Sequence, residues 1–420
     1  MRMTRREMVV AASALAVPPG SAVAAPAKGN PAPDNEKAWG AVARQYPVTR
    51  QVAQLENAYW GSMALPVAAA HRENIARLNR DNSWYARRAM VADQRRALER
   101  AAEAMGVLPE EIGLCRNAAE GLSALIGQFR DVGAGDRILF SDTDYETTQG
   151  AMRTLASARG AEAVKINLPR QITRDNLIET YRDAIMRTPR LKLVLLTHMS
   201  HRHGLVLPVR DIVEIARSRG AEVIVDCAQS FYQLPFKIPD FGADFVGMNF
   251  HKWVGAPLGA AAIWIRQGRT NAIAPAPALP DAPADSVPGR IHQGTVDYSA
   301  QLTIPAALDF QKTIDGAAKL ARLQYLRDRW VRQVRGHAGI EILLPDDRQL
   351  YGATTSFRLS GRTGLEANIA VTDELLTSFG IMTVHRAGLA DGVCIRVTPS
   401  LFTTVEEVDR LAKALLMMAG

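Results

Sequence analysis

Cysteine is scarce in this chain of 420 residues, and its pattern excludes two classes of site. The count of three is odd and sparse, so it provides no disulfide framework. No CxxC pair and no spaced Cys/His metal motif occurs in the sequence. His198, His201 and His203 lie close together, but on a strand end they would alternate between faces, so no metal site is predicted.

Long apolar runs and clusters of basic residues are also missing. Beyond the first 24 residues no apolar stretch is long enough to span a membrane, so no stable membrane span is expected. The formal net charge is +7, but lysine and arginine are scattered, so no nucleic-acid partner is predicted. The hydrophobic content of 47% is typical of a globular protein, and 420 residues are enough for two domains.

The first 24 residues have the pattern of an export signal. Arg5 and Arg6 precede an apolar run at 8–17, and Ala-Val-Ala at 22–24 matches an A-x-A cleavage site. The paired arginines favour the twin-arginine route, which carries folded proteins. The protein is therefore predicted to be exported to the periplasm. The alternatives are a disordered basic tail, or a cytoplasmic enzyme whose N-terminus is never cleaved.

Two predicted buried strands each end in a side chain that can do chemistry. The apolar run 223–225 ends in Asp226, and the run 245–248 leads to Lys252. The carboxyl ends of strands meet at the edge of an α/β sheet where ligands bind. A lysine there can form a Schiff base with a carbonyl cofactor, and an acid can keep a pyridinium nitrogen protonated. From these residues alone, a simple salt bridge between Asp226 and Lys252 is the alternative.

The flanking residues carry a family resemblance. Asp226-x-Ala-Gln229, followed by His251-Lys252-Trp253, resembles the fold-type I enzymes of aminotransferase class V, which depend on pyridoxal 5'-phosphate (PLP). The likeness is strongest to the isopenicillin N epimerase-like branch, and motifs recur in family order over about residues 50–415. The resemblance implies an α/β fold: a large domain with a mostly parallel central sheet flanked by helices, and a smaller α+β C-terminal domain.

The expected division of the chain follows from the same resemblance. It consists of the export signal at 1–24, a leader and N-terminal arm at 25–55, a large PLP-binding domain at 56–295, and a helix linker with the small domain at 296–420. Residues 300–335 are expected to form one long helix.

The resemblance also implies roles for individual residues. Lys252 is expected to hold the cofactor and then act as the general base at Cα. Asp226 is expected to pair with the pyridine nitrogen, Tyr145 to stack on the ring, and Gln229 to lie near the phenolic oxygen. The expected phosphate contacts are Asn117, Ala118, Ala119, Asn249 and His251, joined across a subunit interface by Gly294 and Thr295. A homodimer with shared active sites is therefore expected.

Three positions in the site depart from the family pattern: Ala119, His201 and Gln229, the last of which is a histidine in many relatives of the epimerase branch. Asn117 can cap a helix, with Glu120 at N3 in a capping-box-like arrangement, and such an N-terminus binds phosphate well. Ala119, however, stands where a threonine is usual. His201 occupies a position near the phenolic oxygen but differs in type, so an acid–base role and a hydrogen-bonding role both stay open.

The substrate side is expected to hold an amino acid. Arg396 resembles the family's carboxylate-binding arginine, because its planar fork suits bidentate capture. Tyr59 and Trp60 resemble a loop that covers the substrate, although they could instead pack the N-terminal arm.

The predicted function is that of an exported PLP-dependent enzyme of the aminotransferase or epimerase type. It would act at Cα of an amino acid, or of a residue with a free α-amino group in a small peptide metabolite. Exported members of this branch take part in siderophore maturation, which makes siderophore tailoring one such function. The alternatives are a PLP-dependent lyase or desulfurase and a non-catalytic scaffold. The desulfurase alternative has less support, because desulfurases carry a nucleophilic cysteine in the segment that corresponds to 385–392, and this sequence has no cysteine there.

Overall fold

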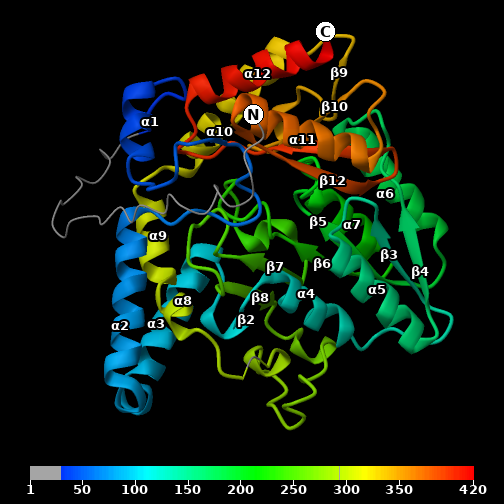
Figure 1. The fold of residues 1–420 in the computed structure, drawn as a ribbon. Coiled ribbons are helices and arrows are strands. Elements are labelled where there is room, and N and C mark those ends of the chain that lie inside the picture. Colours follow the sequence, from blue (N-terminus) through cyan, green and yellow to red (C-terminus); the bar gives the residue numbers. More distant parts are fainter. Residues whose placement is uncertain (1–29, 293) are drawn as a thin grey trace.

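The computed structural model describes residues 30–292 and 294–420 (Figure 1). The predicted export signal at 1–24 lies outside the described residues. Within the described ranges, no helix is both long and apolar enough to cross a membrane.

A seven-stranded sheet forms the centre of the molecule, in the order β2-β8-β7-β6-β5-β3-β4. Its strands are Ile112–Cys115 (β2), Arg137–Ser141 (β3), Glu162–Ile166 (β4), Leu191–Thr197 (β5), Glu222–Asp226 (β6), Phe245–Asn249 (β7) and Ala261–Ile265 (β8). Only β8 pairs antiparallel with its neighbours; the other neighbouring pairs are parallel. The predicted α/β class with a mostly parallel central sheet is confirmed.

Helices cover both faces of this sheet, which explains why its strands read as unbroken apolar runs. Ile224 packs in a core cluster with side chains of α4 and α5, whereas its neighbours Val223 and Val225 pack in a second cluster with α6 and α7. The covering helices are α4 (Ala118–Gly127), α5 (Glu146–Arg159), α6 (Arg174–Arg187) and α7 (Val209–Ser218).

A second, smaller unit lies above the carboxyl end of the central sheet in Figure 1. Its four-stranded antiparallel sheet has the order β12-β13-β10-β9 and packs with helices around a third core cluster. The elements are β9 (Ile340–Ile342), β10 (Thr355–Leu359), β12 (Val384–Leu389), β13 (Gly392–Val397), α11 (Leu365–Phe379) and α12 (Val405–Ala419). The short strand β1 (Ala53–Gln54) pairs with β11 (Ile381–Met382), so the N-terminal arm joins this unit.

The prediction of one long helix at 300–335 is wrong. Three helices occupy this stretch: α8 (Tyr298–Leu302), α9 (Ile304–Lys312) and α10 (Gly316–Val334). Pro305 stands in the first turn of α9, where its missing N–H costs nothing, and Asp315 caps a new start at α10. The remaining helices are α1 (Glu36–Ala43), α2 (Leu65–Arg88) and α3 (Met90–Met105), and α2 and α3 run side by side along one flank (Figure 1).

Candidate active site

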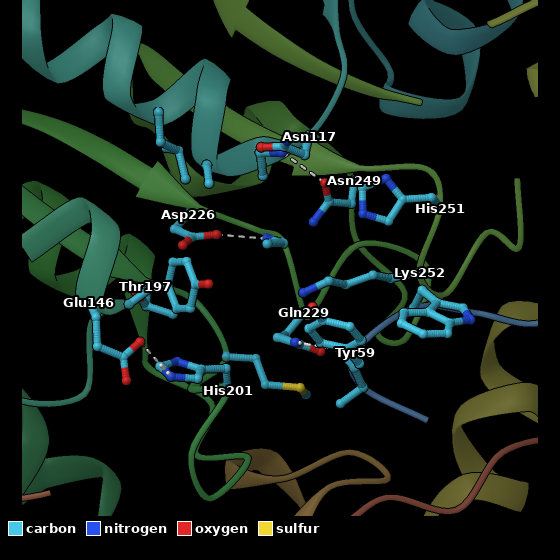
Figure 2. A pocket seen from close by; sticks show the side chains of 18 of the residues that line it. Tyr59, Asn117, Glu146, Thr197, His201, Asp226, Gln229, Asn249, His251 and Lys252 are labelled. Carbon is cyan, nitrogen blue, oxygen red and sulfur yellow. Dashed lines mark hydrogen bonds and ion pairs between the residues drawn. The ribbon is translucent and has the colours of Figure 1, made fainter. Parts of the chain in front are cut away.

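The carboxyl ends of β5, β6 and β7 open into a cavity of about 500 Å³ (Figure 2). The predicted site residues that line it are Tyr59, Trp60, Asn117, Ala118, Ala119, Tyr145, His201, Asp226, Gln229, Asn249, His251, Lys252 and Arg396. Gly294 and Thr295 are exposed and do not line the cavity of their own chain. The structure therefore brings together residues from positions 59 to 396, but leaves the two predicted cross-subunit residues outside.

Asp226 is the last residue of β6, and Lys252 lies in the turn that follows the end of β7 at Asn249. Asp226 is buried, and its Oδ1 accepts a 2.8 Å hydrogen bond from the Ala228 N–H. Within the described chain the two side chains form no ion pair, which rules out the simple salt bridge. Burial, together with the charges of Arg396 and Arg386, lowers the pKa of Lys252 to about 8, although the charge of Asp226 opposes this shift. Burial also raises the pKa of Asp226, although the Ala228 N–H and Lys252 oppose that shift.

The N-terminus of α4 faces the same cavity. Asn117 caps the helix as predicted, because its side chain accepts a 2.9 Å hydrogen bond from the Glu120 N–H. In a capping box the Glu120 carboxylate would accept a hydrogen bond from the N–H of Asn117. Here it accepts instead from the N–H of Arg116, the residue before Asn117. Asn249 Oδ1 accepts from the Ala118 N–H at 2.8 Å. A phosphate at this helix end would therefore compete with Asn249 for that N–H group.

A histidine–carboxylate pair lies on another side of the cavity (Figure 2). His201 Nε2 is 3.2 Å from Glu146 Oε2, and Arg202 holds the other oxygen of Glu146 at 2.9 Å. Burial lowers the pKa of His201 to about 3, although Glu146 opposes this shift. The imidazole is therefore neutral and donates its Nε2 proton to the carboxylate. The Tyr145 ring meets the imidazole edge-on, with centroids 4.9 Å apart.

His251 and Gln229 make their hydrogen bonds to the backbone. His251 Nδ1 lies 3.1 Å from the Ala260 carbonyl, and burial lowers the pKa of His251 to about 4. The Gln229 amide donates to the Ala58 carbonyl at 2.9 Å. Both contacts fix the side chains at the cavity wall, so their orientation does not depend on a ligand.

The cavity has the donor and acceptor set that PLP requires. Thr197 Oγ1, His201 Nδ1 and Gln229 Oε1 are buried at its wall, and none of the three has a hydrogen-bond partner. A buried polar atom without a partner costs about 1–3 kcal/mol, so these atoms point to a polar ligand. Together with the amine of Lys252 and the acid Asp226, they fit a phosphorylated pyridine aldehyde.

Several cavity residues were missed from the sequence. Thr197 ends β5 and pairs in register with Asp226, so extending the predicted strand at 191–196 by one residue would have found it. Glu146 directly follows Tyr145, and its position next to the ring was the available signal. Arg386 lies in the segment 385–392, where the desulfurases carry their cysteine on a mobile loop. Here it lies on β12, an edge strand with an irregular register between Arg386 and Leu389.

Comparison with known proteins places the chain among PLP enzymes. A family model described as "Aminotransferase class-V" matches residues 71–411. The isopenicillin N epimerase of Streptomyces clavuligerus is 28% identical over 341 residues, which cover 77% of this chain and 84% of that protein. A probable cysteine desulfurase of Vibrio cholerae is 24% identical over 314 residues, which cover 71% and 76% of the two chains.

The fold also matches a solved structure that carries the cofactor. A mutant of the cystine C-S lyase C-DES, with glycine covalently linked to its PLP, superposes with a TM-score of 0.74 at 20% identity. The match covers 89% of this chain and 98% of that one. The PLP fold type I architecture predicted from the motifs is confirmed.

Proposed function

The chain belongs to the aminotransferase class-V family of PLP-dependent enzymes, and from that premise we propose a reaction at Cα of an α-amino compound. The substrate would be an amino acid or a small peptide metabolite with a free α-amino group, and the reaction of the aminotransferase or epimerase type. One observation carries this proposal: the buried amine of Lys252, with its pKa lowered to about 8, shares a cavity with Asp226. Bound PLP supplies an electron sink when a bond to Cα breaks.

The residues of the chain supply attachment, orientation and proton transfer. The neutral amine of Lys252 is the nucleophile that holds the cofactor, and when released it takes the Cα proton onto Nζ. Asp226, oriented by the Ala228 N–H, holds a proton at the ring nitrogen. Asn249 and the N-terminus of α4 form the polar end for the phosphate.

The test is the visible absorption of the purified protein before and after Lys252→Ala. The parent should show the band of lysine-bound PLP, and the variant should lose or change it. Lys312→Ala is the control, because Lys312 is a half-exposed lysine paired with Glu103 on the surface. A parent that stays colourless after PLP is added would refute the proposed function and leave a non-catalytic scaffold.

Elimination from Cβ is the second candidate reaction, supported by the likeness to a probable L-cysteine desulfhydrase of Arabidopsis thaliana, which is 24% identical over 282 residues. Lys252 would take the same Cα proton, and a leaving group would then depart from Cβ. A desulfurase with its own cysteine nucleophile is less well supported, because all three cysteines are free, buried and absent from the cavity wall. Burial raises the pKa of Cys394, the cysteine nearest in sequence to Arg396, to about 11.

Product analysis separates these reactions. Incubation with a panel of amino acids and small peptides that have a free α-amino group should give inverted stereochemistry or a keto product from the favoured reaction. Release of pyruvate, ammonia and sulfide from cysteine would instead establish the lyase.

We also propose that the protein works in the periplasm after export by the twin-arginine route. The support is the paired arginines at 5 and 6 and the Ala-Val-Ala at 22–24. N-terminal sequencing of protein from the native cell should begin at Ala25. An intact N-terminus in the cytoplasmic fraction would contradict export.

Two copies of the chain are proposed to share their active sites. Gly294 and Thr295, which match the family's cross-subunit phosphate contact, are exposed and outside the cavity of their own chain. They therefore remain available to a second copy.

A further inference from the structure

Arg396, the arginine expected to bind a substrate carboxylate, is already bound to a carboxylate of the protein. Its Nη2 donates to Glu56 Oε1 at 2.5 Å, and its Nε donates to Glu56 Oε2 at 3.3 Å. Its third nitrogen, Nη1, donates to the carbonyl of His201 at 2.5 Å. Only 1% of the Arg396 surface is exposed. Glu56 therefore occupies, in bidentate form, the Nε–Nη2 fork that an α-carboxylate would use.

The segment that carries Glu56 is fixed at both ends. Glu56 forms a β-bridge with Thr398, and the side chain of Asn57 donates to the Thr398 carbonyl at 2.8 Å. Further along, the Gly61 N–H donates to the His251 carbonyl at 2.8 Å. A Cβ at position 61 would lie 1.7 Å from the Lys252 carbonyl oxygen, so no side chain fits there. Glu56 is thus part of the built site rather than a mobile surface carboxylate.

We propose that Glu56 is a specificity-determining residue that keeps Arg396 from capturing a free α-carboxylate. The preferred substrates would then be amines whose α-carboxyl is an amide or ester, such as the N-terminal residue of a peptide. This inference rests on the proposed function at Lys252 and names the substrate class for it.

The reason is electrostatic. The Glu56 side chain is about one-tenth exposed. A carboxylate that displaced Glu56 would leave a largely buried negative charge unpaired, and one that bound beside it would face a like charge. A carboxamide avoids both costs, because its N–H can donate to the Glu56 carboxylate in a charge-assisted hydrogen bond. Glu56 thus rejects an acid and accepts an amide at the same position.

Arg386 is the competing anchor for a carboxylate. It lines the same cavity, its buried Nε has no partner, and its Nη2 lies 4.0 Å from Glu56 Oε1. A carboxylate bound by Arg386 would make Glu56 irrelevant to the choice between acid and amide. The experiment below separates the two arginines.

The experiment titrates the PLP-loaded protein with L-alanine, L-alaninamide and L-alanylglycine, and records the change in visible absorption. The concentration at half-maximal change is the readout, which measures binding rather than turnover. The parent should favour the amide and the dipeptide over free alanine by at least about tenfold, which is a small part of the cost of one unpaired buried charge. Glu56→Gln should lower that ratio by about tenfold, because the fork of Arg396 opens.

Two variants control the interpretation. Glu146→Gln removes a carboxylate that lines the cavity and pairs with His201 rather than with Arg396, and should leave the ratio unchanged. Glu56→Asp keeps the charge and should keep the preference for the amide, which guards against a Glu56→Gln variant that does not fold.

Two outcomes would overturn the proposal. One is a parent that prefers free alanine, a preference that Arg386→Gln then abolishes. The other is a folded Glu56→Gln variant with an unchanged ratio. Absence of the PLP band in the parent is a separate result, because it would refute the proposed function itself.

Discussion

At the scale of single residues, the protonation of Lys252 decides how readily the site can take up its cofactor. The charges of Arg396 and Arg386 add to the effect of burial, and Asp226 and Glu56 oppose it. With a pKa of about 8, roughly one amine in ten is neutral at pH 7, against roughly one in three thousand for an ordinary lysine. The cavity therefore raises the fraction of neutral, nucleophilic amine at pH 7 by more than about a hundredfold.

Changing the charges around Lys252 should move this pKa in opposite directions. Arg386→Gln removes a positive charge that destabilises the protonated amine of Lys252, so the pKa of Lys252 rises. Asp226→Asn removes a negative charge, so the pKa falls. The measurement is the pH dependence of the rate at which added PLP develops its absorption in cofactor-free protein, with a midpoint near 8 for the parent.

The control for that series is Arg332→Gln, which removes an exposed arginine of α10. Its midpoint should match the parent. A parent midpoint near 10.5, or shifts of the same sign in Arg386→Gln and Asp226→Asn, would contradict this account of the pKa.

The sequence predicted the position of residues that follow a strand end, but not contacts that depend on a distant partner. Asp226 and Lys252 could be found because apolar runs lead directly to them. The pairing of Arg396 with Glu56 joins residues 340 positions apart, and no local pattern signals it. The sequence thus identified the arginine but not the carboxylate that occupies it.

At the scale of elements, the N-terminus of α4 combines a stability role with a binding role. Asn117→Ala removes the cap on the Glu120 N–H and should lower the free energy of unfolding by about 1 kcal/mol. It should also weaken PLP binding, because the side chain lines the cavity. Denaturant unfolding and a PLP titration measure the two effects.

Thr404→Ala is the matched control, since Thr404 caps α12 through the Glu407 N–H outside the cavity. It should show a similar loss of stability with unchanged PLP affinity. Equal weakening of PLP binding in both variants would assign the effect of Asn117 to stability alone.

A buried lysine of α10 supports the loop that carries Lys252. Lys319 Nζ donates to the Trp253 carbonyl at 2.9 Å and to Gln311 Oε1 at 2.8 Å, and Gln311 in turn donates to the Val254 carbonyl. Among the described residues, no carboxylate forms an ion pair with Lys319. Burial lowers the pKa of Lys319 from 10.5 to about 7.

This shift predicts a pH-dependent stability with a definite sign. Between pH 7 and 10.5 the unfolded chain binds more protons at Lys319 than the folded protein does. The free energy of unfolding therefore rises with pH across that window, by up to about 1.4 kcal/mol per pH unit. In Lys319→Gln this contribution should vanish, so the stability of the variant relative to the parent should fall as the pH rises.

Unfolding by urea at several pH values between 7 and 10 measures this difference. Lys312→Gln, which changes an exposed lysine of α9, should track the parent throughout. A constant difference between Lys319→Gln and the parent would show that Lys319 does not titrate in this range.

At the scale of the whole molecule, the fold class was predictable from the sequence, but the pairing of distant segments was not. Apolar runs at 191–196, 223–225 and 245–248 marked the central strands, because both faces of those strands are buried. The pairing of β1 with β11 could not be predicted, since it joins two-residue strands separated by most of the chain. The breaks within 300–335 are a different case, because Pro305 and Asp315 are helix-start signals that are visible in the sequence.

The proposed sharing of active sites leads to a prediction that only the assembled protein can satisfy. In the shared arrangement, Lys252 and Thr295 of one chain serve two different cavities. A dimer of Lys252→Ala chains should be inactive. A dimer of chains that carry both Gly294→Ala and Thr295→Ala should retain the cofactor more weakly in both cavities. Mixing the two proteins under exchange conditions should therefore generate dimers in which one cavity carries both changes and the other carries neither.

That restored cavity should recover activity to about one quarter of the parent level in an equal mixture, because roughly half of the dimers are mixed and each has one intact site. Light scattering would establish the dimer, and a mixture of Lys252→Ala with Asp226→Asn is the control. Those two residues line one cavity of one chain, so their mixture should gain no intact site. If the protein is a dimer but the mixture of Lys252→Ala and Thr295→Ala chains regains no activity, Thr295 lies outside the working site. A monomer with full activity would contradict the shared arrangement altogether.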